Sequence, residues 1–200
     1  MKAIVLITVL LTISISVSGQ KFTIEDIQLR WEDFTTVDGS RPFSAKIATP
    51  VIYRWKTKQD TNGGTLLSFK SEVQVDHARS WVQKEFLNQS WSIKQEVLNH
   101  EKGHLLIAII HHHKLQQMIS NYKFSKNPKR EIDSLYKIVR GSLDMENEKY
   151  DNKTNHYINK EKQKEWTDRL LQELNTIYAN EDKIPLKNEM EIKINYAISD

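Results

Sequence analysis

The chain has 200 residues, with 29 lysines and arginines against 26 aspartates and glutamates, so its formal net charge is only +3. A balance this even gives no reason to expect a nucleic-acid partner, because nucleic-acid-binding domains concentrate basic charge. The lack of cysteine in the sequence excludes disulfides, thiolate metal sites and lipoprotein attachment. Any metal ligands are therefore His, Asp or Glu.

Residues 1–19 have the pattern of a signal peptide. A positive start at Met1-Lys2 precedes the almost wholly apolar stretch 3–17, and Ser18-Gly19 supplies small residues for cleavage. The apolar run is about 15 residues long, shorter than the roughly 20 that cross a bilayer as a helix, although an uncleaved anchor is the alternative. We expect a mature chain of residues 20–200, folded as one domain, secreted or periplasmic, with no membrane contact after cleavage.

The first third of the mature chain predicts a small antiparallel sheet. Apolar and polar residues alternate at period two, or β-branched and aromatic residues gather, in four segments. Pro50 predicts a break or an edge position, and Asn62-Gly63, within 60–64, is typical of a hairpin turn. The expected strands are 22–24, 27–31, 45–55 and 67–75.

The remainder predicts mainly helices, which makes the fold class α+β, with the sheet packed on a helical C-terminal part. Apolar residues at helical spacing indicate four helices and one final strand. We expect a bend at Gly141-Ser142 and a loop in the polar segment before Asn155. The expected helices are 81–87, a long one capped by Ser92 and ending near Tyr122, a third from Pro128, and a fourth with a stripe from Ile158 to Ile177. The final strand is 190–196.

The strongest functional signal is the His-Glu-x-x-His motif at residues 100–104. On a helix, residues four apart share one face, so His100 and His104 can bind the same metal ion. Glu101 lies beside them, where a carboxylate can take a proton from a water that the metal activates. The motif arises by chance in on the order of 1% of chains of this size, but its place in the middle of an amphipathic helix favours one zinc ion over two surface histidines.

A catalytic zinc needs a third protein ligand. His111 shares the helical face but lies about 10.5 Å along the axis from His104, which is too far to share one ion. We therefore expect His111, His112 and His113 to form a polar helix surface. The downstream candidates that stay open are Glu131, Glu146, Glu148, Asp151 and His156.

Several motifs together resemble the bacterial family of predicted secreted zinc-dependent proteases, long catalogued as a domain of unknown function and placed among the zincins. The matching residues span nearly all of the mature chain. They are Leu29-x-Trp31-x-Asp33-Phe34, Ser80-Trp81-Val82, Leu98-Asn99-His100-Glu101-Lys102-Gly103-His104, Tyr150-Asp151-x-x-Thr154-x-His156, Gln163 and Trp166.

This resemblance implies a zincin-like α+β fold and suggests His156 as the third zinc ligand. Tyr150, Asp151 and Thr154 would then be neighbours of the ligands, with hydrogen-bonding or oxyanion-stabilising roles. The chain departs from the family in two places: Leu105-Leu106 stands where members commonly have Phe-Asp, and Tyr157 stands where they have Gly. These departures indicate an altered surrounding of the site, whereas the metal-binding residues are intact.

The leading hypothesis is a secreted metallopeptidase that acts on a peptide or protein substrate with one Zn²⁺ held by His100, His104 and His156. Glu101 would be the general base, and Tyr150 would stabilise the oxyanion. The alternative is a catalytically inactive, zinc-stabilised envelope protein that binds a partner. Zinc-dependent hydrolysis of something other than a peptide is a third option, because these residues only activate water.

Overall fold

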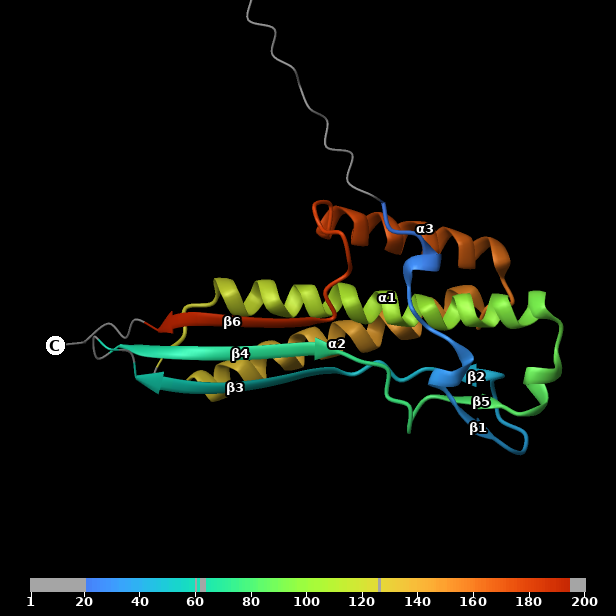
Figure 1. The fold of residues 1–200 in the computed structure, drawn as a ribbon, viewed down its shortest axis with the longest axis horizontal. Helices are drawn as coiled ribbons and strands as arrows, with labels where there is room; N and C mark the ends of the chain where they lie inside the picture. The colour runs from blue at the N-terminus through green and yellow to red at the C-terminus, as the bar shows by residue number, and fades with distance from the viewer. Residues whose placement is uncertain (1–20, 60, 62–63, 126, 195–200) are drawn as a thin grey trace, which may run out of the picture.

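The computed structural model describes residues 21–59, 61, 64–125 and 127–194, and it confirms a mixed α+β fold (Figure 1). This part contains two three-stranded sheets and three α-helices. The long helix α1 (Trp91–Asn121) runs along the molecule, and α2 (Pro128–Thr154) and α3 (Lys160–Ile177) pack against it. The predicted signal peptide lies outside the described residues. None of the helices within them is long and apolar enough to cross a membrane.

The larger sheet is antiparallel, in the order β3-β4-β6. Leu67 and Phe69 of the central strand are fully buried, as the alternating pattern predicts. The C-terminal strand completes this sheet, so the sheet is not confined to the first third of the chain. The predicted hairpin turn at 60–64 falls mostly outside the described residues, as does the end of the predicted last strand. The strands are β3 (Val51–Gln59), β4 (Thr65–Val73) and β6 (Lys187–Ile194).

The smaller sheet has the order β1-β5-β2, with β1 (Thr35–Val37) parallel to β5 (Trp81–Gln83) and β2 (Ala45–Lys46) antiparallel to it. The predicted helix at 81–87 is wrong, because Val82 is buried between two strands and only the 3-10 helix Glu85–Asn88 follows. The predicted strand 45–55 is divided into β2 and β3 by residues 47–50, which belong to neither strand. The break that Pro50 predicts is therefore confirmed.

The two predicted N-terminal strands are also wrong, because the chain forms 3-10 helices at Ile24–Asp26 and Trp31–Asp33. The carboxylate of Asp26 accepts a hydrogen bond from the Thr23 backbone N–H at 2.7 Å, and Asp33 accepts one from Arg30 N–H at 2.8 Å. Such local side-chain bonds compete with strand pairing. The apolar residues between the turns, Ile27 and Leu29, still enter the core.

Helix α1 begins after Ser90, whose hydroxyl accepts from Ile93 N–H, so the cap lies two residues before the predicted Ser92. Its end at Asn121 agrees with the prediction. Pro128 opens α2 as predicted, but the helix continues through Gly141-Ser142 to residue 154. The predicted bend and loop are therefore wrong, because buried residues from Ile132 to Tyr150 keep this helix packed.

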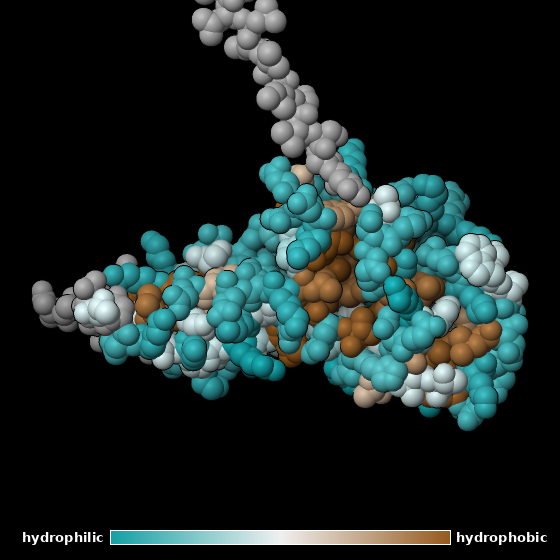
Figure 2. All heavy atoms as spheres, viewed as in Figure 1, coloured by the Kyte–Doolittle hydropathy of each residue, from teal (hydrophilic) through white to brown (hydrophobic). Residues whose placement is uncertain are grey.

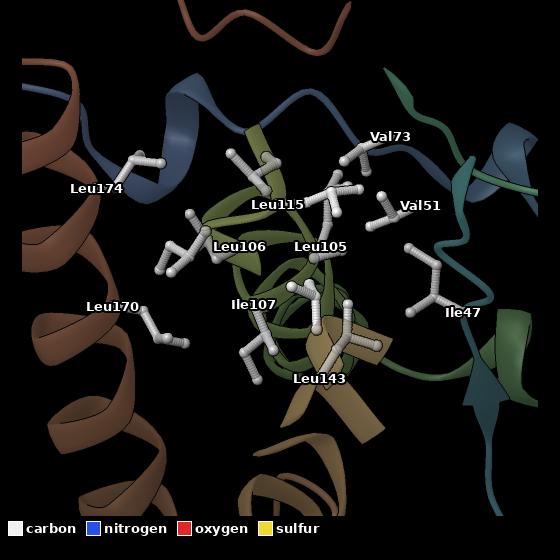
Figure 3. Close-up of a cluster of buried hydrophobic side chains, with 14 of the residues drawn as sticks. Ile47, Val51, Val73, Leu105, Leu106, Ile107, Leu115, Leu143, Leu170 and Leu174 are labelled. Carbon is white, nitrogen blue, oxygen red and sulfur yellow. The ribbon is translucent and has the colours of Figure 1, made fainter. Parts of the chain in front are cut away.

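The core lies between the three helices and the sheets (Figure 3). Leu106 and Leu170 connect α1 to α3, as the predicted stripe of the fourth helix implies, and Leu105 is buried as well. The predicted start of that stripe is wrong, because Ile158 lies before α3 and is exposed. Leu105-Leu106, which replaces the Phe-Asp of the family pattern, is thus a core pair. Figure 2 shows hydrophilic side chains over most of the end that carries the larger sheet, with apolar side chains visible mainly toward the end with α3 and the smaller sheet.

The predicted polar surface of the triple histidine is wrong, because His111 and His112 are buried and His113 is half-buried. The Nε2 atom of His112 lies 2.9 Å from the Ser71 hydroxyl on β4, and the Gln116 amide lies 3.0 Å from it. Burial lowers the pKa of His112 to about 4. His112 is therefore a neutral core residue that joins α1 to the larger sheet.

This burial predicts a loss of stability in acid. The unfolded chain protonates His112 below a pKa of about 6.5, whereas the folded protein resists protonation down to a pKa of about 4. The contribution of neutral His112 to the free energy of unfolding is complete above pH 6.5 and falls by about 3 kcal/mol as the pH drops to 4. Urea unfolding with EDTA present should show a flatter pH dependence in His112→Gln than in the wild type, while His77→Gln, at an exposed site, should leave it unchanged. The same pH dependence of the free energy of unfolding in all three proteins would contradict the assignment of His112 as a neutral core residue.

Candidate metal centre

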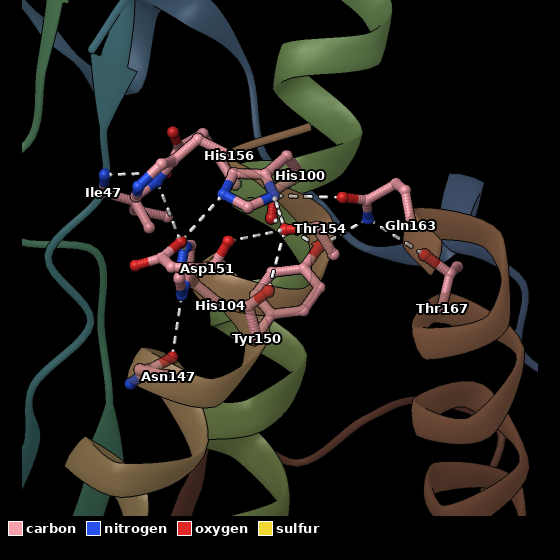
Figure 4. A network of polar contacts seen from close by, with 11 residues as sticks. Ile47, His100, His104, Asn147, Tyr150, Asp151, Thr154, His156, Gln163 and Thr167 are labelled. Atoms are coloured by element: carbon pink, nitrogen blue, oxygen red, sulfur yellow. Dashed lines mark hydrogen bonds and ion pairs between the residues drawn. The ribbon is translucent and has the colours of Figure 1, made fainter. Parts of the chain in front are cut away.

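Two helices bring together three side chains of the types that can bind a metal (Figure 4). His100 and His104 lie one turn apart on α1, and Asp151 faces them from the last turn of α2. The Oδ1 atom of Asp151 lies 3.1 Å from Nε2 of His100 and 3.0 Å from Nε2 of His104. One ligand atom from each residue lies within 4.8 Å of the others. This His-His-Asp group could hold a metal ion.

The partners of the two Nδ1 atoms fix the imidazole tautomers. His100 Nδ1 lies 3.0 Å from Oε1 of Gln163, and His104 Nδ1 lies 2.8 Å from Oδ1 of Asn147. The Gln163 NH₂ group donates to the Tyr150 hydroxyl, which leaves its oxygen toward His100. With these partners each Nδ1 donates a proton to an amide oxygen, so that in the neutral form of each imidazole the Nε2 lone pair would face the Asp151 carboxylate. A cation between them, either a proton on Nε2 or one metal ion, would relieve this repulsion.

The electrostatics of the group also favour a positive charge. Burial by itself raises the pKa of Asp151, but hydrogen bonds from His100 and His104 outweigh it and hold that pKa well below its ordinary value. Burial lowers the pKa of His104, yet the bond to Asp151 and the charge of Glu101 raise it above its ordinary value. The two carboxylates thus stabilise a cation beside the histidines, whether it is a proton or a metal.

The donor set fits a small divalent cation. Bonds of 2.0–2.1 Å to nitrogen and oxygen in a tetrahedron place neighbouring ligand atoms about 3.3 Å apart. The separations of 3.0 and 3.1 Å between Asp151 Oδ1 and the imidazole nitrogens are close to this value. Two imidazoles and one carboxylate are also a ligand set that occurs in catalytic zinc sites.

His156, the predicted third ligand, lies at the edge of this group rather than within it. Its Nδ1 is 3.4 Å from Asp151 Oδ1, but His156 is not among the residues whose ligand atoms all lie within 4.8 Å of one another. The chain turns away from α2 there, because Asn155, His156 and Tyr157 all have positive φ angles, of 46°, 50° and 79°. Tyr157 thus takes a backbone conformation that favours the glycine of the family pattern, at a cost of roughly 1–2 kcal/mol. Of the open candidates, Asp151 is the one that the structure groups with His100 and His104.

The other open candidates lie elsewhere. Glu131 accepts from the backbone of Ser125, Glu146 pairs with Arg169 at 2.6 Å, and Glu148 is exposed. Sequence reasoning missed Asn147 as a histidine partner. Its position four residues before Asp151 is the signal that could have placed it on the same face of α2.

Glu101 lies in a cleft of about 720 Å³ together with His100, His104 and Asp151. Its buried Oε2 accepts a hydrogen bond from the Ile47 backbone N–H at 2.9 Å. One wall of the cleft is the segment 42–50, which contains β2, and the other is formed by α1, α2 and the loop 155–158. The motif carboxylate is therefore fixed in the same space as the candidate metal ligands.

Tyr150 does not reach this cleft. Its hydroxyl is buried, donates to the His100 carbonyl at 3.1 Å and accepts from Gln163, and its ring stacks on the His100 imidazole. Burial raises the pKa of Tyr150 well above its ordinary value. The predicted oxyanion role does not fit this geometry, and Tyr150 is placed to position His100. Thr154 is also buried, 3.5 Å from His100 Nδ1, and donates to the Tyr150 carbonyl.

Gly103 is one of the two variable positions of the His-Glu-x-x-His motif, and the packing around it explains why a glycine stands there. A Cβ there would overlap the Tyr150 hydroxyl, whereas a Cβ at Gly141, also within a helix, would meet nothing. We expect Gly103→Ala to destabilise the protein by about 1–3 kcal/mol through overpacking. Gly141→Ala should stabilise it by about 0.5–1 kcal/mol, because alanine is the better helix former. Urea unfolding of the metal-free variants checks both signs, and a neutral Gly103→Ala would contradict the close packing.

Comparison with protein-family models, curated proteins and solved structures finds no match to this chain. The family resemblance therefore stays a prediction, and the function has to be argued from the cleft and its side chains.

Proposed function

We propose that this chain is a secreted zinc metallopeptidase in which His100, His104 and Asp151 hold the metal. The observation that carries the proposal is the meeting of both Nε2 atoms on one Asp151 oxygen, with the Glu101 carboxylate in the same cleft. Zinc in such a site would supply a Lewis acid that polarises a carbonyl and makes water more acidic. The assignment of Asp151 replaces His156 as the third ligand.

Glu101 has the position of a general base. The Ile47 N–H fixes one carboxylate oxygen, Oε2, and so orients the group in the cleft. The carboxylate would take a proton from the attacking water and pass it to the leaving amine. His100 and His104 are held in orientation by Gln163 and Asn147, so neither needs to reorganise during the reaction.

The edge of β2 supports a peptide as the substrate. Ser44 and Lys46 form the backbone bonds to β5, as the bond from Gln83 N–H to Ser44 C=O and the register show. The N–H and C=O of Ala45 therefore point away from β5, on the side where Ile47 N–H meets Glu101. An extended peptide can pair with this edge and place a carbonyl beside the metal-binding side chains.

The test is a digest of unfolded proteins and peptides by residues 20–200, with zinc content measured alongside. We expect about one zinc per chain and cleavage that a chelator abolishes and added zinc restores. Zinc-dependent thermal stability without cleavage would favour the non-catalytic, partner-binding alternative. A chain that binds no zinc would overturn both readings.

A further inference from the structure

The two walls of the cleft touch each other at its rim. Phe43 belongs to the wall that contains β2, and His156 belongs to the loop after α2. Their ring centroids are 4.1 Å apart, with an angle of 35° between the planes. Phe43 is 38% exposed and the His156 side chain 35%, whereas the bond between Ile47 and Glu101 is buried. The aromatic contact is therefore at the surface, and the Glu101 bond is at the floor.

The His156 side of this contact is held in place. Three backbone hydrogen bonds close the turn between α2 and α3: His156 N–H to Asp151 C=O at 3.2 Å, Ile158 N–H to Asn155 C=O at 3.1 Å, and Asn159 N–H to Thr154 C=O at 2.8 Å. The imidazole also reaches Asp151 Oδ1 at 3.4 Å. His156 is therefore the fixed side of the contact, and a movement that opens the rim has to come from Phe43.

The Phe43 side is held less firmly. The Gln83 side chain donates to the Phe43 and Arg41 carbonyls, which fixes the backbone before β2. The Phe43 ring itself has His156 as its aromatic partner and is partly exposed. A rotation of this one side chain would open the contact at the rim without breaking a backbone hydrogen bond, while the Ile47–Glu101 bond still joins the walls at the floor.

We propose that Phe43 determines access to the metal centre. With its ring on His156, Phe43 narrows the rim beside Asp151, whose side chain is 30% exposed, and the rim widens when Phe43 turns outward. That the entering ligand is a peptide rests on the proposed function, whereas the narrowing of the rim does not. An aromatic contact of this kind shifts an open–closed equilibrium by about two- to tenfold, which sets the size of the expected effect.

The first experiment measures how fast diethyl pyrocarbonate modifies His156 in metal-free protein, followed by mass spectrometry of the peptides. Phe43→Ala and Phe43→Leu should raise the rate at His156 by about two- to tenfold. The exposed His77 is the internal reference. Trp91→Ala removes a larger, more exposed ring that does not line the cleft and should change nothing. An unchanged His156 rate in both Phe43 variants, with native circular dichroism, would overturn the proposal.

The second experiment measures zinc release to an excess of chelator. Phe43→Ala should release zinc about two- to tenfold faster than the wild type, and Trp91→Ala should match the wild type. Faster modification of His156 in a protein that holds no zinc would sink the proposed function and leave the access role standing. Zinc-dependent cleavage by the wild type, together with unchanged rates of zinc release and His156 modification in the Phe43 variants, would support the proposed function and exclude the access role of Phe43.

Discussion

Glu101→Gln is expected to keep its zinc and to lose about 10²- to 10⁴-fold in kcat/KM, the usual contribution of a general base. Glutamine has the same shape, and its oxygen can still accept the hydrogen bond from Ile47 N–H. It cannot take a proton from water. Zinc per chain by mass spectrometry and initial rates on a cleaved peptide separate the two effects.

The matched control is Glu173→Gln, which removes a carboxylate that pairs with Lys114 at 3.0 Å on the surface. It should leave both zinc content and kcat/KM unchanged. Hydrolysis by Glu101→Gln at the wild-type rate would exclude Glu101 as the base. Loss of zinc in that variant would instead show that Glu101 contributes to metal binding.

Asp151→Ala is expected to weaken zinc binding by more than about 100-fold, beyond the 10- to 100-fold that loss of an outer hydrogen-bond partner costs. The reason is that Asp151 supplies the oxygen on which both imidazole nitrogens converge. Removal of the carboxylate would leave two ligands. Competition with a chromophoric chelator measures the affinity.

Two further variants calibrate this result. Asn147→Ala removes only the partner of His104 Nδ1 and should fall within about 10- to 100-fold. His156→Ala should change the affinity by less than about tenfold, because His156 lies outside the group. A large loss in His156→Ala together with a small one in Asp151→Ala would restore the ligand set that the family resemblance implies.

The sequence was sufficient to predict the motif helix and the segment that lies against its histidines. His100 and His104 follow from their spacing alone, and the segment 150–156 is indeed the one that faces them. The choice within that segment depends on where α2 ends. We expected a loop before Asn155, but the helix continues to Thr154, so Asp151 faces α1 while the left-handed residues place His156 at the edge of the group.

The errors in the strands have a similar origin. Period-two alternation in 22–31 is genuine, and it does bury Ile27 and Leu29. The carboxylates of Asp26 and Asp33 satisfy backbone N–H groups that a strand would pair, and propensity does not register that competition. The burial of His112 could not be predicted from the sequence either, because its partner Ser71 lies 41 residues away on another element.

The pairing of β6 with β4 bears on the order in which the chain can fold. A polypeptide is synthesised from its N-terminus, so the segment that pairs with Leu67 emerges more than a hundred residues after it. Until then one edge of β4 has no partner strand, whereas every residue around the metal centre, up to Gln163, has already been made. The residues of the histidine–aspartate group are therefore available before the last strand arrives, whereas completion of the sheet has to wait for β6 and for a pairing across a long stretch of chain.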